Sequence, residues 1–137
     1  MPKSYLSLTL DDAKRMMAAG EAAAAGFGVA YNIAVVDACG HLIAFVRQDD
    51  ALAGSIGLAI GKAKTARLFD KTTSYLATLA QPGEPLFGIE QSNAGDVVIF
   101  GGGLPVLIGD AIVGAVGASA GTVEQDIAVA EAAAAAI

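Results

Sequence analysis

The sequence contains one cysteine, one histidine and no tryptophan among its 137 residues. Cys39 alone excludes an internal disulfide, and His41 as the only histidine leaves no Cys/His set that could complete a structural zinc site. The two residues lie two positions apart in "DACGHLIAF". We therefore expect no metal centre in this chain.

Charge is also scarce. Charged residues make up 16% of the chain and hydrophobic residues 55%; about 25% charged is typical of soluble domains. The net charge of −6 comes from 14 acidic and 8 basic residues, and the one local basic group is Lys62, Lys64 and Arg67. This excludes the clustered cationic face that nucleic-acid binding requires. The apolar surface predicts a homo-oligomer, with an alanine-rich monomer as the alternative.

Long apolar runs are missing too. No uncharged stretch reaches the roughly 18 apolar residues of a membrane-spanning helix, and the first residues, "MPKSYLSLTLDDAKRMM", do not have the pattern of a secretory signal. We expect a cytoplasmic protein without membrane association. Its length fits one domain over residues 1–137.

The first half of the chain alternates helical and strand patterns. Helical spacing predicts a helix that starts after Thr9 and ends near Gly26, and a second helix over residues 54–69. Between them, residues 31–36 and 41–47 form a predicted β-hairpin. A short third helix is expected within residues 71–80, capped by Thr72 or Thr73, and a long loop follows.

Three short β-rich runs fill residues 97–120, and Gly109-Asp110 marks a hairpin between the last two. Thr122 and Gln125 form a capping box that starts the last helix. Strands joined by such tight turns must be antiparallel. The pattern therefore predicts an α/β (α+β) fold, an α/β/α sandwich with a five-stranded, largely antiparallel sheet and helices on both faces.

Asp37 and Gly40 have clear structural roles in the turn of the first hairpin. Asp37 is suited to bond local backbone amides, and Gly40 supplies a positive φ. His41 then heads the returning strand. It is either a functional imidazole near a pocket or interface, or a partly exposed strand histidine.

The second candidate site is the strand-to-helix turn at residues 117–126. Small residues there let a ligand approach the backbone, and Ser119, Gly121 and Thr122 would line a site for a carboxylate or another anion at the helix start. The alternative is an ordinary capped helix, because Glu124 and Asp126 already place negative charge in the first turn. The glycines of "FGGGLP" predict a bulge or bend.

Lys62 lies on an otherwise apolar helix. It is either a surface residue whose stem covers apolar neighbours or a cation that faces a pocket.

Four motifs occur in an order and spacing that resemble the GlcG/HbpS family, also called the haem-degrading domain family: "DACGHLIAFVR", "SIGLAIGKAKTA", "GGLP" and "GTVEQD". The resemblance covers nearly the whole chain. It implies a GlcG-like, profilin-like α/β/α sandwich with a five-stranded sheet, and homo-oligomers from dimers to octamers. Members bind haem, act as redox sensors, or form the C-terminal domain of a corrinoid adenosyltransferase.

The resemblance thus implies a pocket near the 37–47 hairpin, the Lys62 helix and the 117–126 turn, for a small organic ligand or a planar cofactor such as haem or corrinoid. The candidate ligand-binding residues are Asp37, Arg47, Thr65, Ser119, Gly121, Thr122 and Gln125. Two alternatives remain. One is a metal-independent enzyme for a hydroxy or oxo acid, with Lys62 or His41 as acid/base; the other is an accessory structural oligomer without catalysis.

Overall fold

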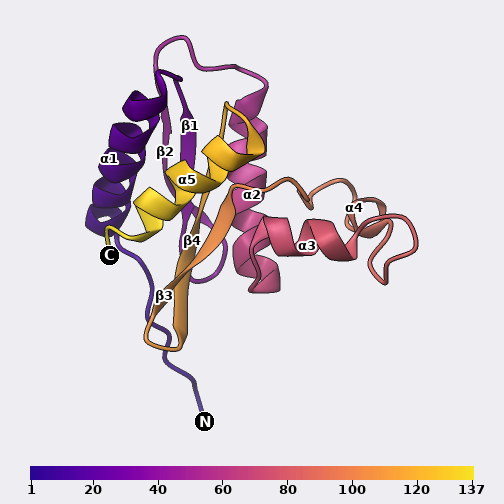
Figure 1. Cartoon of the computed structure of the whole chain (residues 1–137). Coiled ribbons are helices and arrows are strands. Elements are labelled where there is room, and N and C mark those ends of the chain that lie inside the picture. The colour runs from indigo at the N-terminus through magenta and orange to yellow at the C-terminus, as the bar shows by residue number, and fades with distance from the viewer.

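The structure, a computed structural model, describes all 137 residues as five helices and four strands (Figure 1). In chain order the elements are α1 (Leu10–Phe27), β1 (Asn32–Val36), β2 (Leu42–Arg47), α2 (Ser55–Phe69), α3 (Thr73–Leu79), α4 (Ile89–Ser92), β3 (Gly103–Ile108), β4 (Ala111–Ser119) and α5 (Val123–Ala134). None of the helices is both long and apolar enough to span a lipid bilayer.

The four strands form one antiparallel sheet in the order β2-β1-β4-β3. The central strands β1 and β4 are buried along almost their whole length, because helices cover both faces. This explains why their sequences do not alternate between apolar and polar residues. In the central pair Asn32 lies opposite Ser119, and Val36 lies opposite Ala115.

The helices form two layers around the sheet (Figure 1). α1 and α5 pack together on one face, over a core that includes Met16, Ile33, Val116 and Val129. α2 covers the other face through closely spaced alanines. α3 and α4 extend away from the sheet as an arm (Figure 1), with a small apolar cluster of their own.

The prediction of five strands is wrong by one strand. Residues 97–100 have strong β-propensity, but no partner strand pairs with them. The Val98 N–H instead donates to Thr65 Oγ1 on α2, at 3.0 Å, and Val97 packs into the cluster of the arm. Contacts with helices have here overridden the local strand preference.

The expected helix starts are confirmed. Thr9, Thr72 and Thr122 each cap a helix with the side chain, and Thr122 forms its capping box with Gln125. The predicted end of α1 is two residues early. Gly28, at φ 67°, is the left-handed residue that closes the helix.

Gly117 of β4 sets how closely α2 approaches the sheet. A Cβ at this position would collide with the Ala59 carbonyl oxygen and would lie 2.6 Å from the Ala63 backbone nitrogen. Both are backbone atoms of α2, so neither can move aside without shifting the helix. Glycine at 117 is therefore a packing requirement.

We expect Gly117→Ala to lower the free energy of unfolding by about 3 kcal/mol, the upper range for overpacking a core. Gly26→Ala is the control, because a Cβ there meets no atom within 4 Å, and alanine in a helix is favoured by about 1 kcal/mol. Urea denaturation of both variants measures the difference. Equal stability of the two variants would contradict the packing role.

Candidate functional site

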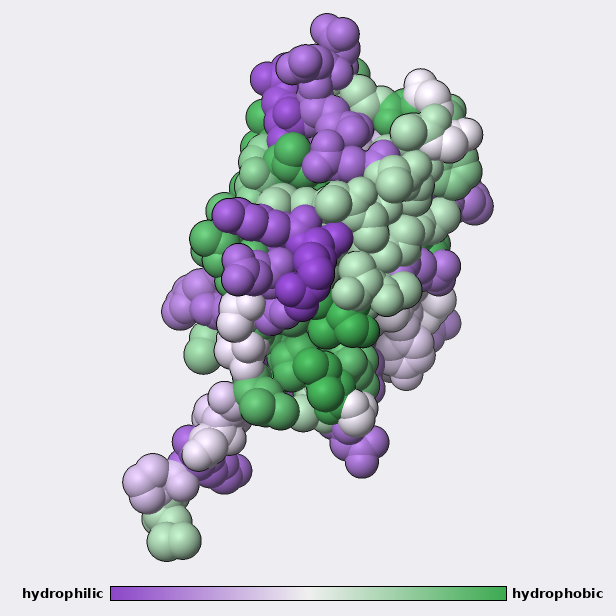
Figure 2. Space-filling model, turned by 90° about the vertical axis from the view of Figure 1, so that its left-hand side faces the viewer, coloured by the Kyte–Doolittle hydropathy of each residue, from purple (hydrophilic) through white to green (hydrophobic).

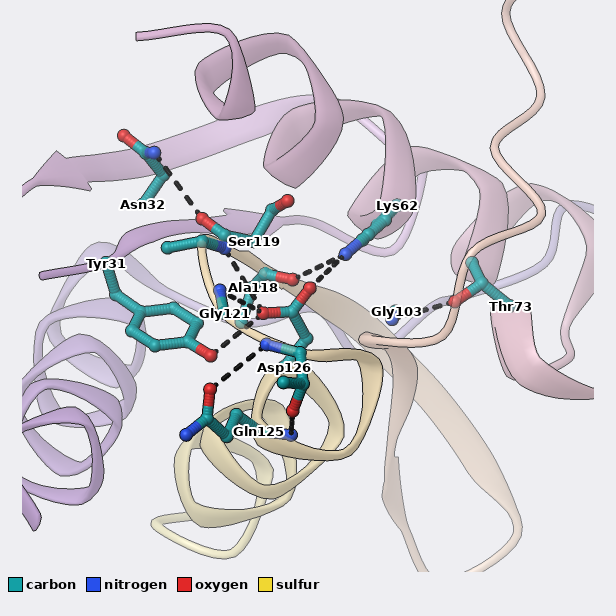
Figure 3. A network of polar contacts seen from close by, with 12 residues as sticks. Tyr31, Asn32, Lys62, Thr73, Gly103, Ala118, Ser119, Gly121, Gln125 and Asp126 are labelled. Carbon is teal, nitrogen blue, oxygen red and sulfur yellow. Dashed lines mark hydrogen bonds and ion pairs between the residues drawn. The ribbon is translucent and has the colours of Figure 1, made fainter. Parts of the chain in front are cut away.

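The most connected polar cluster of the molecule lies where β4 turns into α5 (Figure 3). Asp126, in the first turn of α5, points inward and is 4% exposed. Its Oδ1 accepts hydrogen bonds from the Tyr31 hydroxyl at 2.8 Å and from the Ala120 and Gly121 N–H groups at 3.2 and 3.0 Å. Its Oδ2 pairs with the Lys62 ammonium at 2.8 Å.

Lys62 reaches this carboxylate from α2, on the other layer of the sandwich, and is 1% exposed. Its Nζ also donates to the Ala118 carbonyl oxygen at 3.0 Å. The sequence had left two possibilities for Lys62, an exposed surface residue or a cation facing a pocket. The structure instead buries the ammonium in an ion pair with Asp126.

Gly102 makes room for this ion pair. It has a φ of 119°, and a Cβ there would lie 2.7 Å from the Ala118 carbonyl oxygen and 3.1 Å from Lys62 Nζ. The predicted bend in "FGGGLP" thus passes directly beside the pair. Gly103 then enters β3, and its N–H donates to Thr73 Oγ1 at 2.9 Å.

Burial and the neighbouring charge also act on Tyr31. Burial is the main cause that raises the pKa of its hydroxyl well above the usual value, and the hydrogen bond to Asp126 and the charge of that carboxylate add to it. The phenol therefore remains protonated and donates to Asp126 over the physiological pH range.

Asn32 lies beside this cluster and is completely buried. Its Nδ2 donates to the Leu52 carbonyl oxygen at 2.9 Å and to that of Ser119 at 3.4 Å. Its Oδ1 is buried and has no hydrogen-bond partner. Asn32 thus ties the start of β1 to the end of β4 and to the loop that precedes α2.

The expected anion site at the start of α5 is filled by the chain itself. The Ala120 and Gly121 N–H groups bind the Asp126 carboxylate, and the Thr122 N–H donates to Gln125 Oε1 at 3.0 Å. The structure thus brings Lys62, Ser119, Gly121, Thr122 and Gln125 together at one end of the sheet, with their backbone donors already engaged.

Other candidate residues lie apart from this cluster. Thr65 is buried further along α2, where it binds the 97–100 segment. Arg47 is exposed at the end of β2, opposite Asn32 in the sheet, and its Nε donates to the Ala51 carbonyl oxygen at 3.2 Å.

Asp37 and His41 lie at the opposite end of the sheet from Ser119. Val36 lies next to Asp37, and Asn32 lies opposite Ser119. Val36 and Asn32 are four residues apart on β1, which corresponds to roughly 13 Å of strand. Within one chain, therefore, the imidazole of His41 does not converge with Lys62 and Ser119.

The hairpin turn itself has the expected geometry. Asp37 Oδ1 accepts the Cys39 N–H at 2.8 Å and the His41 N–H at 3.0 Å. Gly40 has a φ of 84°. Burial alone would raise the pKa of Asp37, but the amide donors of His41 and Cys39 outweigh it and hold that pKa below its ordinary value. Cys39 and His41 are both exposed.

Sequence reasoning missed the roles of Tyr31, Asn32 and Asp126 in this cluster. The sequence does contain a pattern that indicates burial of Asp126, because Asp126 shares a helix face with Val129, Ala130 and Ala133, which are all buried. Lys62 likewise falls within the stripe formed by the buried alanines of α2. A charged residue within each of two core-facing stripes indicates a buried pair.

The fold and this cluster define an α/β/α sandwich whose two helical layers are joined by a buried Lys–Asp pair. The chain belongs to the family described as haem degrading protein HbpS-like, whose sequence model matches residues 8–135.

Relatives of known sequence and structure agree with this membership. The chain is 42% identical over 125 residues to an uncharacterized 15.0 kDa protein from the dhaT-dhaS intergenic region of Citrobacter freundii, covering 91% of this chain and 88% of that protein. It is 38% identical over 132 residues to the corrinoid adenosyltransferase PduO of the same organism, covering 96% of this chain and 39% of that longer protein. The crystal structure of the PduOC:heme complex matches with a TM-score of 0.93 and 36% identity, over 96% of both chains.

The ion pair predicts a large difference between two lysines of α2. Lys62→Ala would leave the Asp126 carboxylate buried without its cation, which typically costs about 3–5 kcal/mol of unfolding free energy. The control is Lys64→Ala, an exposed position on the same helix, where a change within about 0.5 kcal/mol is usual. Urea denaturation of both variants tests this, and a loss at Lys62 as small as that at Lys64 would contradict it.

The lowered pKa of Asp37 predicts a pH-dependent contribution to stability. A carboxyl whose pKa is lower in the folded state stabilises the protein above its unfolded pKa of about 3.9, and this contribution disappears as the pH falls through the folded pKa. We therefore expect Asp37→Asn to be less stable than the parent chain near neutral pH, with the difference shrinking at acid pH. Thermal melts across this range test it, and a difference independent of pH would count against it.

Proposed function

We propose that this chain is a small homo-oligomeric protein that binds haem or a related planar cofactor such as a corrinoid. The observation that carries the proposal is its similarity to PduOC, a protein crystallised as a heme complex, over 96% of both chains. The relationship to the corrinoid adenosyltransferase PduO supports the wider class of tetrapyrrole ligands.

Haem requires an axial ligand from the protein. His41 is exposed and its imidazole makes no hydrogen bond within the chain. Met16 is completely buried, and the hydroxyl of Tyr31 is engaged by Asp126. Tyr5 and Tyr75 are exposed as well, but an imidazole is the axial ligand in globins and peroxidases. His41 is therefore the residue that would hold the iron. Bound haem would supply redox-active iron.

The shape of the protomer supports a site that is open or shared between copies. A cavity of about 510 Å³ lies between the N-terminal segment, the end of α2 and the β3–β4 turn. His41 does not line any of the main cavities. Haem bound through His41 would thus need a second surface to cover its other face.

The exposed apolar side chains favour such a second surface, supplied by another copy of the chain. Outside the N-terminal segment, the large apolar side chains that are half exposed or more are Leu52, Leu68, Phe87, Phe100, Leu107 and Ile108. Figure 2 shows, from the α1 side, hydrophilic groups next to a broad, weakly hydrophobic area and a strongly hydrophobic patch below it. Contiguous exposed apolar patches mark association surfaces in soluble proteins, and most soluble oligomers are homo-oligomers.

The alternative of a catabolic enzyme has no comparable support. The Lys62 ammonium is buried and already bonded to Asp126 and to the Ala118 carbonyl oxygen. A substrate would have to displace one of these partners before Lys62 could exchange a proton with it.

Haem titration tests the proposal. The purified protein should give a Soret band distinct from that of free haem at micromolar haem, because ligation of the iron changes its absorption. His41→Ala should lose this band, whereas Cys39→Ser should retain it. Size-exclusion chromatography of the three proteins controls for a change in assembly. Absence of a spectral change in the parent chain would overturn haem as the ligand. An unchanged spectrum in His41→Ala would overturn the assignment of His41 as the residue that holds the iron.

A further inference from the structure

A separate cavity of about 340 Å³ lies on the outer side of α2, against the segment that leads to β3. Its apolar wall is formed by Ile60 and Leu68 of α2 and by Val98 of the facing segment. The volume is at the lower end of the range for small-molecule sites, about 300–1,000 Å³. It therefore suits a small metabolite and is too small to enclose a tetrapyrrole.

Two glycines of α2 form this cavity. A Cβ at Gly61 would lie 2.7 Å from Val98 Cγ2, so glycine at 61 lets the facing segment pack directly on the helix. Gly57 lies one turn earlier, and a Cβ there would meet no atom within 4 Å. Glycine at 57 is not needed for packing within the chain, and its missing side chain leaves that end of the cavity open.

Two opposite charges line the same cavity without neutralising each other. Lys64 projects from α2 and Asp96 from the facing segment, and both are exposed. The chain contains three ion pairs within 4.0 Å, and neither residue takes part in any of them. The cavity therefore presents a free cation, a free carboxylate and an apolar wall together.

We propose that this cavity binds a small zwitterion with an apolar body, namely an α-amino acid with a branched aliphatic or aromatic side chain. The carboxylate of the ligand pairs with Lys64, its ammonium group pairs with Asp96, and its side chain packs on Ile60 and Val98. Each contact satisfies a group that the chain leaves without a partner. The site is independent of the haem proposal, since it does not involve His41.

Calorimetric titration of the full chain with L-leucine and L-phenylalanine tests the site. Both should bind with a dissociation constant of about 1 mM or tighter, as expected for a ligand of this size. Three analogues each lack one recognised feature: 4-methylpentanoate lacks the ammonium group, isopentylamine lacks the carboxylate, and glycine lacks the apolar side chain. The first two should bind up to about fivefold more weakly than leucine, and glycine should bind more weakly because it buries no apolar side chain.

Variants assign the contacts. Lys64→Gln and Asp96→Asn should each weaken leucine binding about fivefold, and Asp96→Asn should leave 4-methylpentanoate binding unchanged. Lys14→Gln, on α1, is the matched control and should bind leucine as the parent does. Gly57→Leu should block leucine by filling the open end of the cavity.

Three results would overturn the proposal: no heat signal from either amino acid at about 10 mM, far above the expected dissociation constant; equal affinity for leucine and 4-methylpentanoate; or unchanged affinity in both charge variants. Haem titration of Lys64→Gln separates the two proposals. An unchanged Soret band in a variant that has lost leucine binding shows two sites, and a failed haem titration leaves the amino-acid measurement valid.

Discussion

The buried carboxylate of Asp126 is the group on which the arrangement of the two helical layers depends. It is the one side chain that contacts α2 through Lys62, the start of β1 through Tyr31, and its own β4–α5 turn through two backbone N–H groups. A charge in a low-dielectric interior is costly unless each of its oxygens is satisfied. Here both oxygens are satisfied, so the position of α5 is specified relative to α2 as well as relative to the sheet.

This network also occupies the backbone N–H groups at the start of α5. The free N–H groups at the start of a helix are a common anion site, but in this chain Asp126 occupies that position as an internal anion. Both sites proposed above lie instead on outer surfaces: the hairpin end with His41, and the outer flank of α2 with Lys64 and Asp96. The two lysines of α2 illustrate the difference between the buried network and the outer surface, because Lys62 faces the sheet and Lys64 faces solvent.

The sequence predicted features that depend on near neighbours. Thr9 and Thr122 cap their helices, and Asp37 and Gly40 shape the hairpin turn, because each acts on backbone within four residues. The prediction of a fifth strand was wrong because the structure of that segment depends on distant residues. Its β-branched residues fit a strand locally, but the Val98 N–H is bound by Thr65, 33 residues away. The partner of Lys62 is 64 residues distant, so no pattern within α2 alone identifies it, and the pair is indicated only when the core-facing positions of α2 and α5 are compared.

The two ends of the sheet are held by different carboxylates. At the hairpin end Asp37 accepts the Cys39 and His41 N–H groups, and the Ala38 N–H donates to Ser7 Oγ of the N-terminal segment. At the other end Asp126 pairs with Lys62 of α2. A substitution at His41 is therefore expected to leave the Lys62 network intact, since sites far apart with no shared partners behave additively. A scaffold of this kind retains its fold while its surface chemistry diverges.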